Sequence, residues 1–318
     1  MYKQFYGFKR NPFEISPDPK FYFATPLHNE ALASLVYGVK KRKGFVVTTG
    51  EVGTGKSLLI QCFLQWLTRS QVPFSHVFNT RLSPLEFLQY FVSDLGMPLI
   101  NNKAEILIHL NHYLIEQYRR GSTTVLVVDE GQLLDCEVLE EIRLLTNLET
   151  AEQKLLQIIL VGQPELEHKL DSPGLRQLKQ RITFRCRLHP LSQEQTRAYI
   201  AHRLQTAGAN SHADSLFPET TMVAIAHYSR GIPRLINTLC ENALIEGYAR
   251  EAQTITVEMI TQIAADSRLE SAQCCDLLSD SFDQNALVKD LFATIEASTP
   301  QAAKKLSVNT EEKDGPDL

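Results

Sequence analysis

Residues 45–57 read Phe45-Val46-Val47-Thr48-Thr49-Gly50-Glu51-Val52-Gly53-Thr54-Gly55-Lys56-Ser57, and this stretch decides the fold. It joins a short apolar strand to the pattern Gly-x-x-x-x-Gly-Lys-Ser, and an apolar-faced helix is predicted directly behind it, over 56–68. Glycines let backbone N–H groups close around phosphate oxygens, and a helix N-terminus favours negative charge. The residues from Gly50 to Leu58 are therefore predicted to bind the phosphates of a nucleotide, whereas a chance Gly-rich turn would need neither the strand nor the helix.

A second motif lies further along the chain, where the buried, β-branched run 125–128 ends in Asp129-Glu130. Alone, this pair could simply cap the next helix. After a core strand, Asp129 is instead predicted to ligate Mg²⁺ together with the Ser57 hydroxyl, and Glu130 to polarise the attacking water. Lys56 is predicted to reach the β- and γ-phosphates. The two motifs together predict an enzyme that binds a nucleoside triphosphate with Mg²⁺ and hydrolyses it.

Three further polar residues are candidates for the same reaction. Gln163 follows the apolar run 156–161 and is predicted to orient the water, unless it is an ordinary turn residue. Arg181 belongs to a run of five cations without an acid, Arg176 to Arg187. It could act as an arginine finger on a neighbouring subunit, contact nucleic acid, or lie on a solvated edge. Arg234 starts a helix and could point back at the γ-phosphate.

The order of strands and helices predicts the architecture. From 44 to 190 they alternate, which predicts a three-layer α/β fold with a parallel sheet covered on both faces. After Pro190 only helices follow, the first opened by the capping box Ser192-to-Gln195. We expect four parts: an aromatic- and Pro-rich segment with a first helix (1–43), the nucleotide-binding domain (44–190), a small all-helical domain (191–267) and a polar, largely disordered tail (268–318) with one apolar helical stripe at 286–297. The aromatics of 1–30 are expected to pack onto the domain that follows them.

Composition narrows the class of protein. With 43% hydrophobic and 22% charged residues the chain is not disordered throughout, and a net charge of −5 argues against a general nucleic-acid binder. Six cysteines without zinc-like spacing indicate a reducing compartment. The N-terminus has no signal-peptide pattern, and no apolar run approaches the roughly 18–20 residues that span a bilayer. We expect a cytoplasmic protein, or one peripheral to the inner membrane.

These motifs resemble the AAA+ ATPases and, more narrowly, the general secretion pathway protein A (ExeA-type) family. The resemblance covers about residues 1–265 and lies in the stretches Phe5–Phe8, Asn11–Phe13, Ser16–Pro19, Gly50–Ser57, Val128–Gln132, Leu160–Leu166, Gln180–Ile182, Leu188–Leu191 and Gly231–Asn237. It implies that the helical domain is a lid, that the protein is an ATP-dependent homo-oligomer, and that its partners are cell-envelope assembly proteins. The system served would be secretion, pilus or polysaccharide export.

Two departures from the family pattern leave alternatives open. Gly131 stands where Walker B of the family continues with Ala, and long members carry a transmembrane segment and a peptidoglycan-binding domain that residues 266–318 cannot hold. We therefore expect a short form. One alternative is an ATP-dependent, DNA-binding transposition regulator of the TniB or Tn7 kind, in which the cations from Arg176 to Arg187 follow phosphates. Another is an adaptor that binds ATP and hardly hydrolyses it, which the presence of Glu130 and Arg181 argues against.

Overall fold

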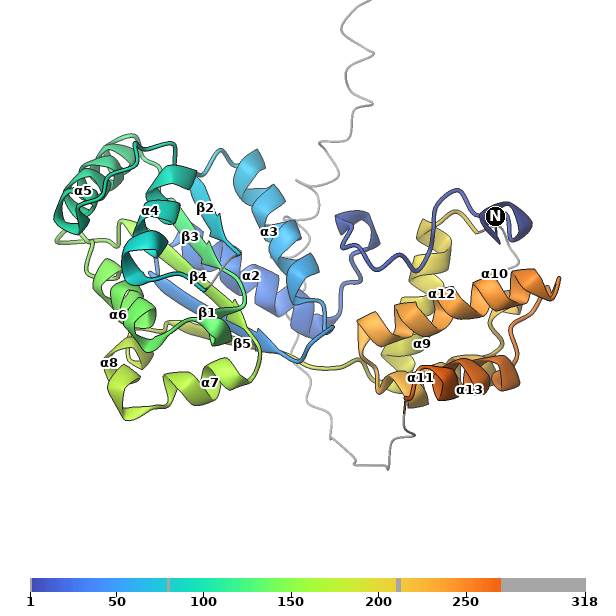
Figure 1. The fold of residues 1–318 in the computed structure, drawn as a ribbon. Coiled ribbons are helices and arrows are strands. Elements are labelled where there is room, and N and C mark those ends of the chain that lie inside the picture. Colours follow the sequence, from blue (N-terminus) through green and yellow to red (C-terminus); the bar gives the residue numbers. More distant parts are fainter. Residues whose placement is uncertain (1, 79–80, 210–212, 270–318) are drawn as a thin grey trace, which may run out of the picture. The chain divides into compact units, whose positions relative to one another are not determined.

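The computed structural model describes residues 2–78, 81–209 and 213–269 (Figure 1). Apart from its first two residues, the predicted tail at 268–318 lies outside this part, as does the stripe at 286–297. All described residues belong to one compact unit, which contains two hydrophobic clusters. One cluster surrounds a β-sheet, and the other joins the helices after Pro190 to the N-terminal segment. The division of the chain at 43, 190 and 267 stays a prediction.

Five parallel strands form the sheet in the order β2-β3-β4-β1-β5. Their bounds are Phe45–Gly50 (β1), Phe74–Val77 (β2), Thr124–Val128 (β3), Leu156–Gly162 (β4) and Phe184–Leu188 (β5). Strands β1, β3 and β4 are buried along their whole length, as expected where helices cover both faces. The expected edge strand begins at Phe184 rather than Ile182, because the N–H groups of Arg181 and Ile182 close a turn on the carbonyls of Leu178 and Lys179.

Helices lie on both faces of this sheet (Figure 1). They are α2 (Pro26–Lys40), α3 (Lys56–Arg69), α4 (Pro84–Asp94), α5 (Lys103–Arg119), α6 (Cys136–Leu145), α7 (Glu165–Leu170) and α8 (Arg176–Lys179), with the 3-10 turns η2 (Gly131–Leu133) and η3 (Pro173–Leu175). Side chains alternate along β1: Val47 joins the cluster that contains residues of α4, α5 and α6, whereas Val46 packs on Gly38 of α2. The prediction of a three-layer α/β fold with a parallel sheet is confirmed.

The helices after Pro190 have the second cluster as their core. They are α9 (Gln193–Thr206), α10 (Ala213–Leu216), α11 (Glu219–Ser229), α12 (Pro233–Ala249) and α13 (Val257–Asp266). The predicted capping box is present, since Ser192 and Gln195 each accept from the other's backbone N–H. Ile200, Ile225 and Leu239 are fully buried where α9, α11 and α12 meet.

The N-terminal segment packs mainly on these helices, so the prediction that its aromatics cover the α/β domain is wrong. It contains α1 (Tyr2–Phe5) and the turn η1 (Pro19–Phe21). The ring of Phe13 lies 5.9 Å from that of Phe217, and the Tyr2 hydroxyl donates to Glu241 at 2.8 Å. The physical reason is that α2 and α3 already cover their face of the sheet, whereas α9 offers both apolar surface and hydrogen-bond donors to this segment.

Arg203 of α9 supplies those donors. It is 5% exposed, lies 4.6 Å from the centre of the Phe21 ring, and donates to the carbonyl oxygens of Pro12 (2.5 Å) and Glu14 (3.1 Å). A buried guanidinium is stable only when its N–H groups are paired, so these carbonyls and the aromatic rings give it the environment that it needs.

Candidate active site

The loop between β1 and α3 has a backbone that requires glycine. Gly53 and Gly55 have φ angles of +84° and +102°, a region that other residues rarely adopt. A Cβ on Gly53 would lie 2.8 Å from Cβ of Arg234, and a Cβ on Gly55 would lie 3.0 Å from Nε2 of His28. The loop can therefore keep its backbone amides close to a ligand only with glycine at both positions.

Lys56 is the first residue of α3 and is 7% exposed. Its Nζ donates to the carbonyl oxygens of Gly50 (2.6 Å) and Glu51 (2.9 Å). Burial lowers the pKa of Lys56, while the charges of Glu130 and Asp129 oppose that shift. The structure thus brings the predicted phosphate-binding lysine close to both predicted carboxylates. Phosphate oxygens could replace the two loop carbonyls as its partners.

The two carboxylates follow β3, at the same edge of the sheet as the loop. Glu130 has a φ of +51°, and its N–H donates to Oδ1 of Asp129 at 2.8 Å. Its Oε2 accepts hydrogen bonds from Nε2 of Gln132 at 2.5 Å and from Nε2 of Gln163, which follows β4, at 3.3 Å. A left-handed conformation in a glutamate costs free energy, and such strain clusters at functional sites. The amides of Gln132 and Gln163 together hold the Glu130 carboxylate in one orientation.

Asp129 lies in an environment that disfavours its charge. Burial raises its pKa, and the nearby carboxylate of Glu130 adds to the shift. No cluster of three or more His, Cys, Asp or Glu side chains suited to a metal occurs in the described part of the chain. Mg²⁺ needs none, since it commonly takes one or two carboxylates with phosphate oxygens and waters. Asp129 and the exposed Ser57 are oxygen donors of the kind that could hold such a cation beside phosphates.

Helix α12 begins beside the loop, and its start is tightly packed. The N–H of Arg234 donates to the carbonyl of Gly53 at 3.2 Å. Gly231 has a φ of +70°, and a Cβ there would lie only 1.9 Å from the carbonyl oxygen of Leu191. The structure therefore brings Arg234 to the predicted phosphate loop, with its side chain exposed. Contact with a γ-phosphate stays a prediction.

Comparison with known proteins shows which proteins this chain resembles. Residues 39–170 match the AAA domain family. Over 257 residues, 80% of this chain, the sequence is 42% identical to general secretion pathway protein A of Aeromonas hydrophila. The chain carries an AAA domain and is a relative of general secretion pathway protein A. The family resemblance predicted from the motifs is confirmed. The match covers 46% of the relative, so this chain spans less than half of its length.

Solved structures show the same fold. The ORC2 protein of Aeropyrum pernix, in ADPNP–ADP complexes, has a TM-score of 0.61 at 16% identity, covering 83% of this chain and 73% of that chain. Drosophila ORC bound to DNA has a TM-score of 0.62 at 17% identity, covering 81% of this chain and 65% of that one. At these identities the likeness concerns the fold alone. It confirms the predicted P-loop NTPase fold of the AAA+ type.

Two further residues of the site were not assigned a role from the sequence. The amide oxygen of Gln132 accepts the N–H of Gln163 at 2.9 Å while its amide nitrogen donates to Glu130, so Gln132 links the ends of β3 and β4. Nε2 of His28 donates to the carbonyl of Thr54 at 3.0 Å, and its Nδ1 accepts from the Thr25 hydroxyl at 2.6 Å. Burial lowers the pKa of His28, which agrees with a neutral ring. For Gln132 the available signal was its place at the end of the family-like stretch Val128–Gln132.

Arg181 is not brought to this site. It precedes β5, and the hydroxyl of Thr183 beside it donates at 2.7 Å to the carbonyl of Lys43, just before β1. The phosphate loop follows the other end of β1. One strand length, about 20 Å at 3.3 Å per residue, therefore separates Arg181 from the phosphate loop of its own chain.

The described helices were also compared with what a bilayer requires. None of those within residues 2–269 combines the length and the apolar character of a membrane-spanning helix.

Proposed function

We propose that this chain is an AAA+ ATPase of the ExeA type that hydrolyses ATP to ADP and phosphate and assists a cell-envelope secretion, pilus or polysaccharide export system. The observation that carries the hydrolysis is the Glu130 carboxylate, held by Gln132 and Gln163 and close to the buried Lys56. The relative with 42% identity supports the secretion context. In this proposal the protein is cytoplasmic and works at the inner membrane.

Each residue then has a distinct part in the reaction. The amides of residues 50–58 and the Lys56 ammonium bind the phosphates, and Ser57 and Asp129 hold Mg²⁺, which neutralises phosphate charge when bound. Glu130 accepts a proton from the attacking water, because it is an oriented carboxylate in a partly buried site. Gln163 orients the same water through its amide. Arg234, next to Gly53, adds positive charge at the loop.

The proposal includes an ATP-dependent homo-oligomer. Arg181 lies a strand length from its own phosphate loop, so it can reach a γ-phosphate only in a neighbouring subunit. An arginine supplied in this way typically increases turnover by about 10³–10⁵-fold. ATP at the boundary between subunits would then favour assembly, because it is contacted from both sides.

The experiment that tests hydrolysis is the Glu130→Gln variant. The amide keeps the shape of the side chain and cannot accept the proton of water, so ATP binding should be retained and turnover should fall by at least about 10²-fold. Binding is measured with a fluorescent ATP analogue and turnover by phosphate release. Unchanged hydrolysis in a correctly folded variant would remove Glu130 from the catalytic role and with it the proposed mechanism.

The DNA-binding transposition regulator stays a second prediction, on the strength of the cations from Arg176 to Arg187. Two of these cations already have acidic partners: Lys179 pairs with Asp171, and Arg185 with Glu167, both at 2.5 Å. Filter binding of duplex DNA over a salt series decides the question, because phosphate contacts make affinity fall steeply with salt. Absence of binding at low salt would exclude this function.

A further inference from the structure

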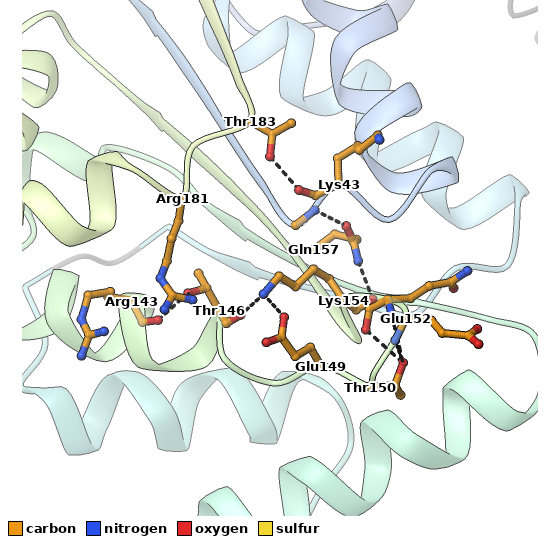
Figure 2. Close-up of polar contacts among 12 residues, drawn as sticks. Lys43, Arg143, Thr146, Glu149, Thr150, Glu152, Lys154, Gln157, Arg181 and Thr183 are labelled. Carbon is orange, nitrogen blue, oxygen red and sulfur yellow. Dashed lines mark hydrogen bonds and ion pairs between the residues drawn. The ribbon is translucent and has the colours of Figure 1, made fainter.

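A threonine at the end of α6 holds the guanidinium of Arg181 (Figure 2). Nη1 of Arg181 donates to Oγ1 of Thr146 at 2.8 Å, and Thr146 itself is only 5% exposed. An arginine side chain has many rotamers and loses roughly 1.5–2 kcal/mol of conformational freedom when it is ordered. If a buried hydroxyl already orders the side chain, a later contact of the guanidinium does not have to meet this entropic cost again.

Thr146 is itself firmly placed. It is the C-cap residue of α6, and its hydroxyl donates to the carbonyl of Arg143 at 2.5 Å. The hydroxyl hydrogen is thus used within the helix, which leaves a lone pair of Oγ1 for Arg181. Nζ of Lys154 donates to the Thr146 carbonyl at 3.0 Å and also pairs with Glu149 (Figure 2). Hydrogen bonds on both its side chain and its carbonyl keep Thr146 in position.

The N-terminal end of α6 follows the edge of the sheet that carries the predicted phosphate loop and Glu130. The chain passes from Glu130 through η2 into α6, and Nζ of Lys169 donates to the carbonyls of Gln132 and Leu134, both at 2.7 Å. Helix α6 has 10 residues, which is about 15 Å, and its Val138 and Ile142 are fully buried in the cluster around the sheet. One packed helix therefore links the segment that carries Glu130 to the hydroxyl that holds Arg181.

We propose that Thr146 is the positioning residue of the arginine finger: its hydroxyl orders the Arg181 guanidinium, which acts on the nucleotide of a neighbouring subunit, and it does so from a helix joined through η2 to Glu130 of its own subunit. This inference rests on the proposed function, because it needs Arg181 to act on a neighbour's ATP. Positioning a group before reaction lowers the entropic barrier of the step that uses it. Thr146 then acts only through Arg181 of its own subunit, and never on the nucleotide bound by that subunit.

Mixed oligomers distinguish an effect of Thr146 through Arg181 from an effect of Thr146 on the nucleotide site of its own subunit. In the reference mixture, Lys56→Ala subunits supply the finger and Arg181→Ala subunits supply the nucleotide site. In the second mixture the finger subunit also carries Thr146→Val, which keeps the shape and removes the hydroxyl. In the third mixture Thr146→Val is placed in the Arg181→Ala subunit instead. We expect turnover in the second mixture to fall by about 2- to 10-fold, the equivalent of one net hydrogen bond, and turnover in the third to equal the reference.

The remaining outcomes are equally distinct. Thr146→Ser in the finger subunit keeps the hydroxyl and should restore the reference rate. Equal losses in the second and third mixtures, or no loss in either, would show that Thr146 does not position the finger. An inactive reference mixture with an active wild type would disprove the trans-acting Arg181 and overturn this inference with it. A wild type that binds ATP without hydrolysing it would instead refute the proposed function.

Discussion

Replacing Phe13 by alanine should destabilise the helical part of the protein, although Phe13 lies near the start of the chain. Its side chain is fully buried, and its ring meets that of Phe217 edge-on at 5.9 Å. Truncating a buried phenylalanine costs about 3–5 kcal/mol, which includes the cavity that is left. Since domains are stable by only about 5–15 kcal/mol, this loss is about a fifth or more of the total.

Urea unfolding followed by far-ultraviolet circular dichroism measures this loss. With a slope of about 2–3 kcal/mol per molar urea, the midpoint should fall by at least about 1 M. The matched control is Ile15→Ala in the same segment: Ile15 is 56% exposed, so its truncation should change stability by less than about 0.5 kcal/mol. If Phe13→Ala shifts the midpoint no more than Ile15→Ala does, the segment is not part of the helical core.

Three further predictions follow from the site. Lys56→Ala should weaken ATP binding at least tenfold, about 1.4 kcal/mol, because it removes the buried charge that faces the phosphates; a fluorescent nucleotide titration with unchanged affinity would contradict this. On going from pH 7 to pH 5, the wild type should lose more stability than His28→Gln, as measured by urea unfolding at each pH. Burial lowers the pKa of His28 in the folded state below its unfolded value of about 6.5. As the pH decreases, the unfolded chain therefore binds the proton first, and the free energy of unfolding decreases. Gly231→Ala should destabilise the fold by more than about 2 kcal/mol, since its Cβ would lie 1.9 Å from the Leu191 carbonyl oxygen at a φ of +70°; a thermal midpoint within a degree of wild type would disprove it.

The strand–loop–helix at 45–57 and the place of Asp129 and Glu130 after a buried strand could be predicted because each is a continuous stretch whose local structure limits its residue types, while their roles toward a nucleotide stay predictions. Gly53 and Gly55 need positive φ, Lys56 must start a helix, and Glu130 must follow a buried strand. The alternation of apolar strands with helices likewise predicted the parallel sheet. The capping box at Ser192 predicted a helix start for the same reason, since the cap is satisfied by a residue three positions away.

What could not be predicted depends on which distant surfaces meet. Aromatic residues near the start of the chain show only that something will be buried, not whether a sheet or a helix bundle buries it. The placement of Phe21 follows from Arg203, a charged residue whose burial no local pattern signals. The role of Gln132 depends in the same way on the order of strands, which sets β4 and therefore Gln163 beside β3.

The contact between the N-terminal segment and α9 also limits how this chain can be recombined. The matched AAA domain, residues 39–170, omits β5 and nearly all of α2. A lineage that exchanged only the helices after Pro190 would leave Phe13 and Phe21 facing a foreign surface, and an exchange of the first residues alone would leave the buried Arg203 without its carbonyl partners. The beginning and the end of residues 2–269 are therefore expected to be inherited as a pair, with the nucleotide-binding sheet carried between them.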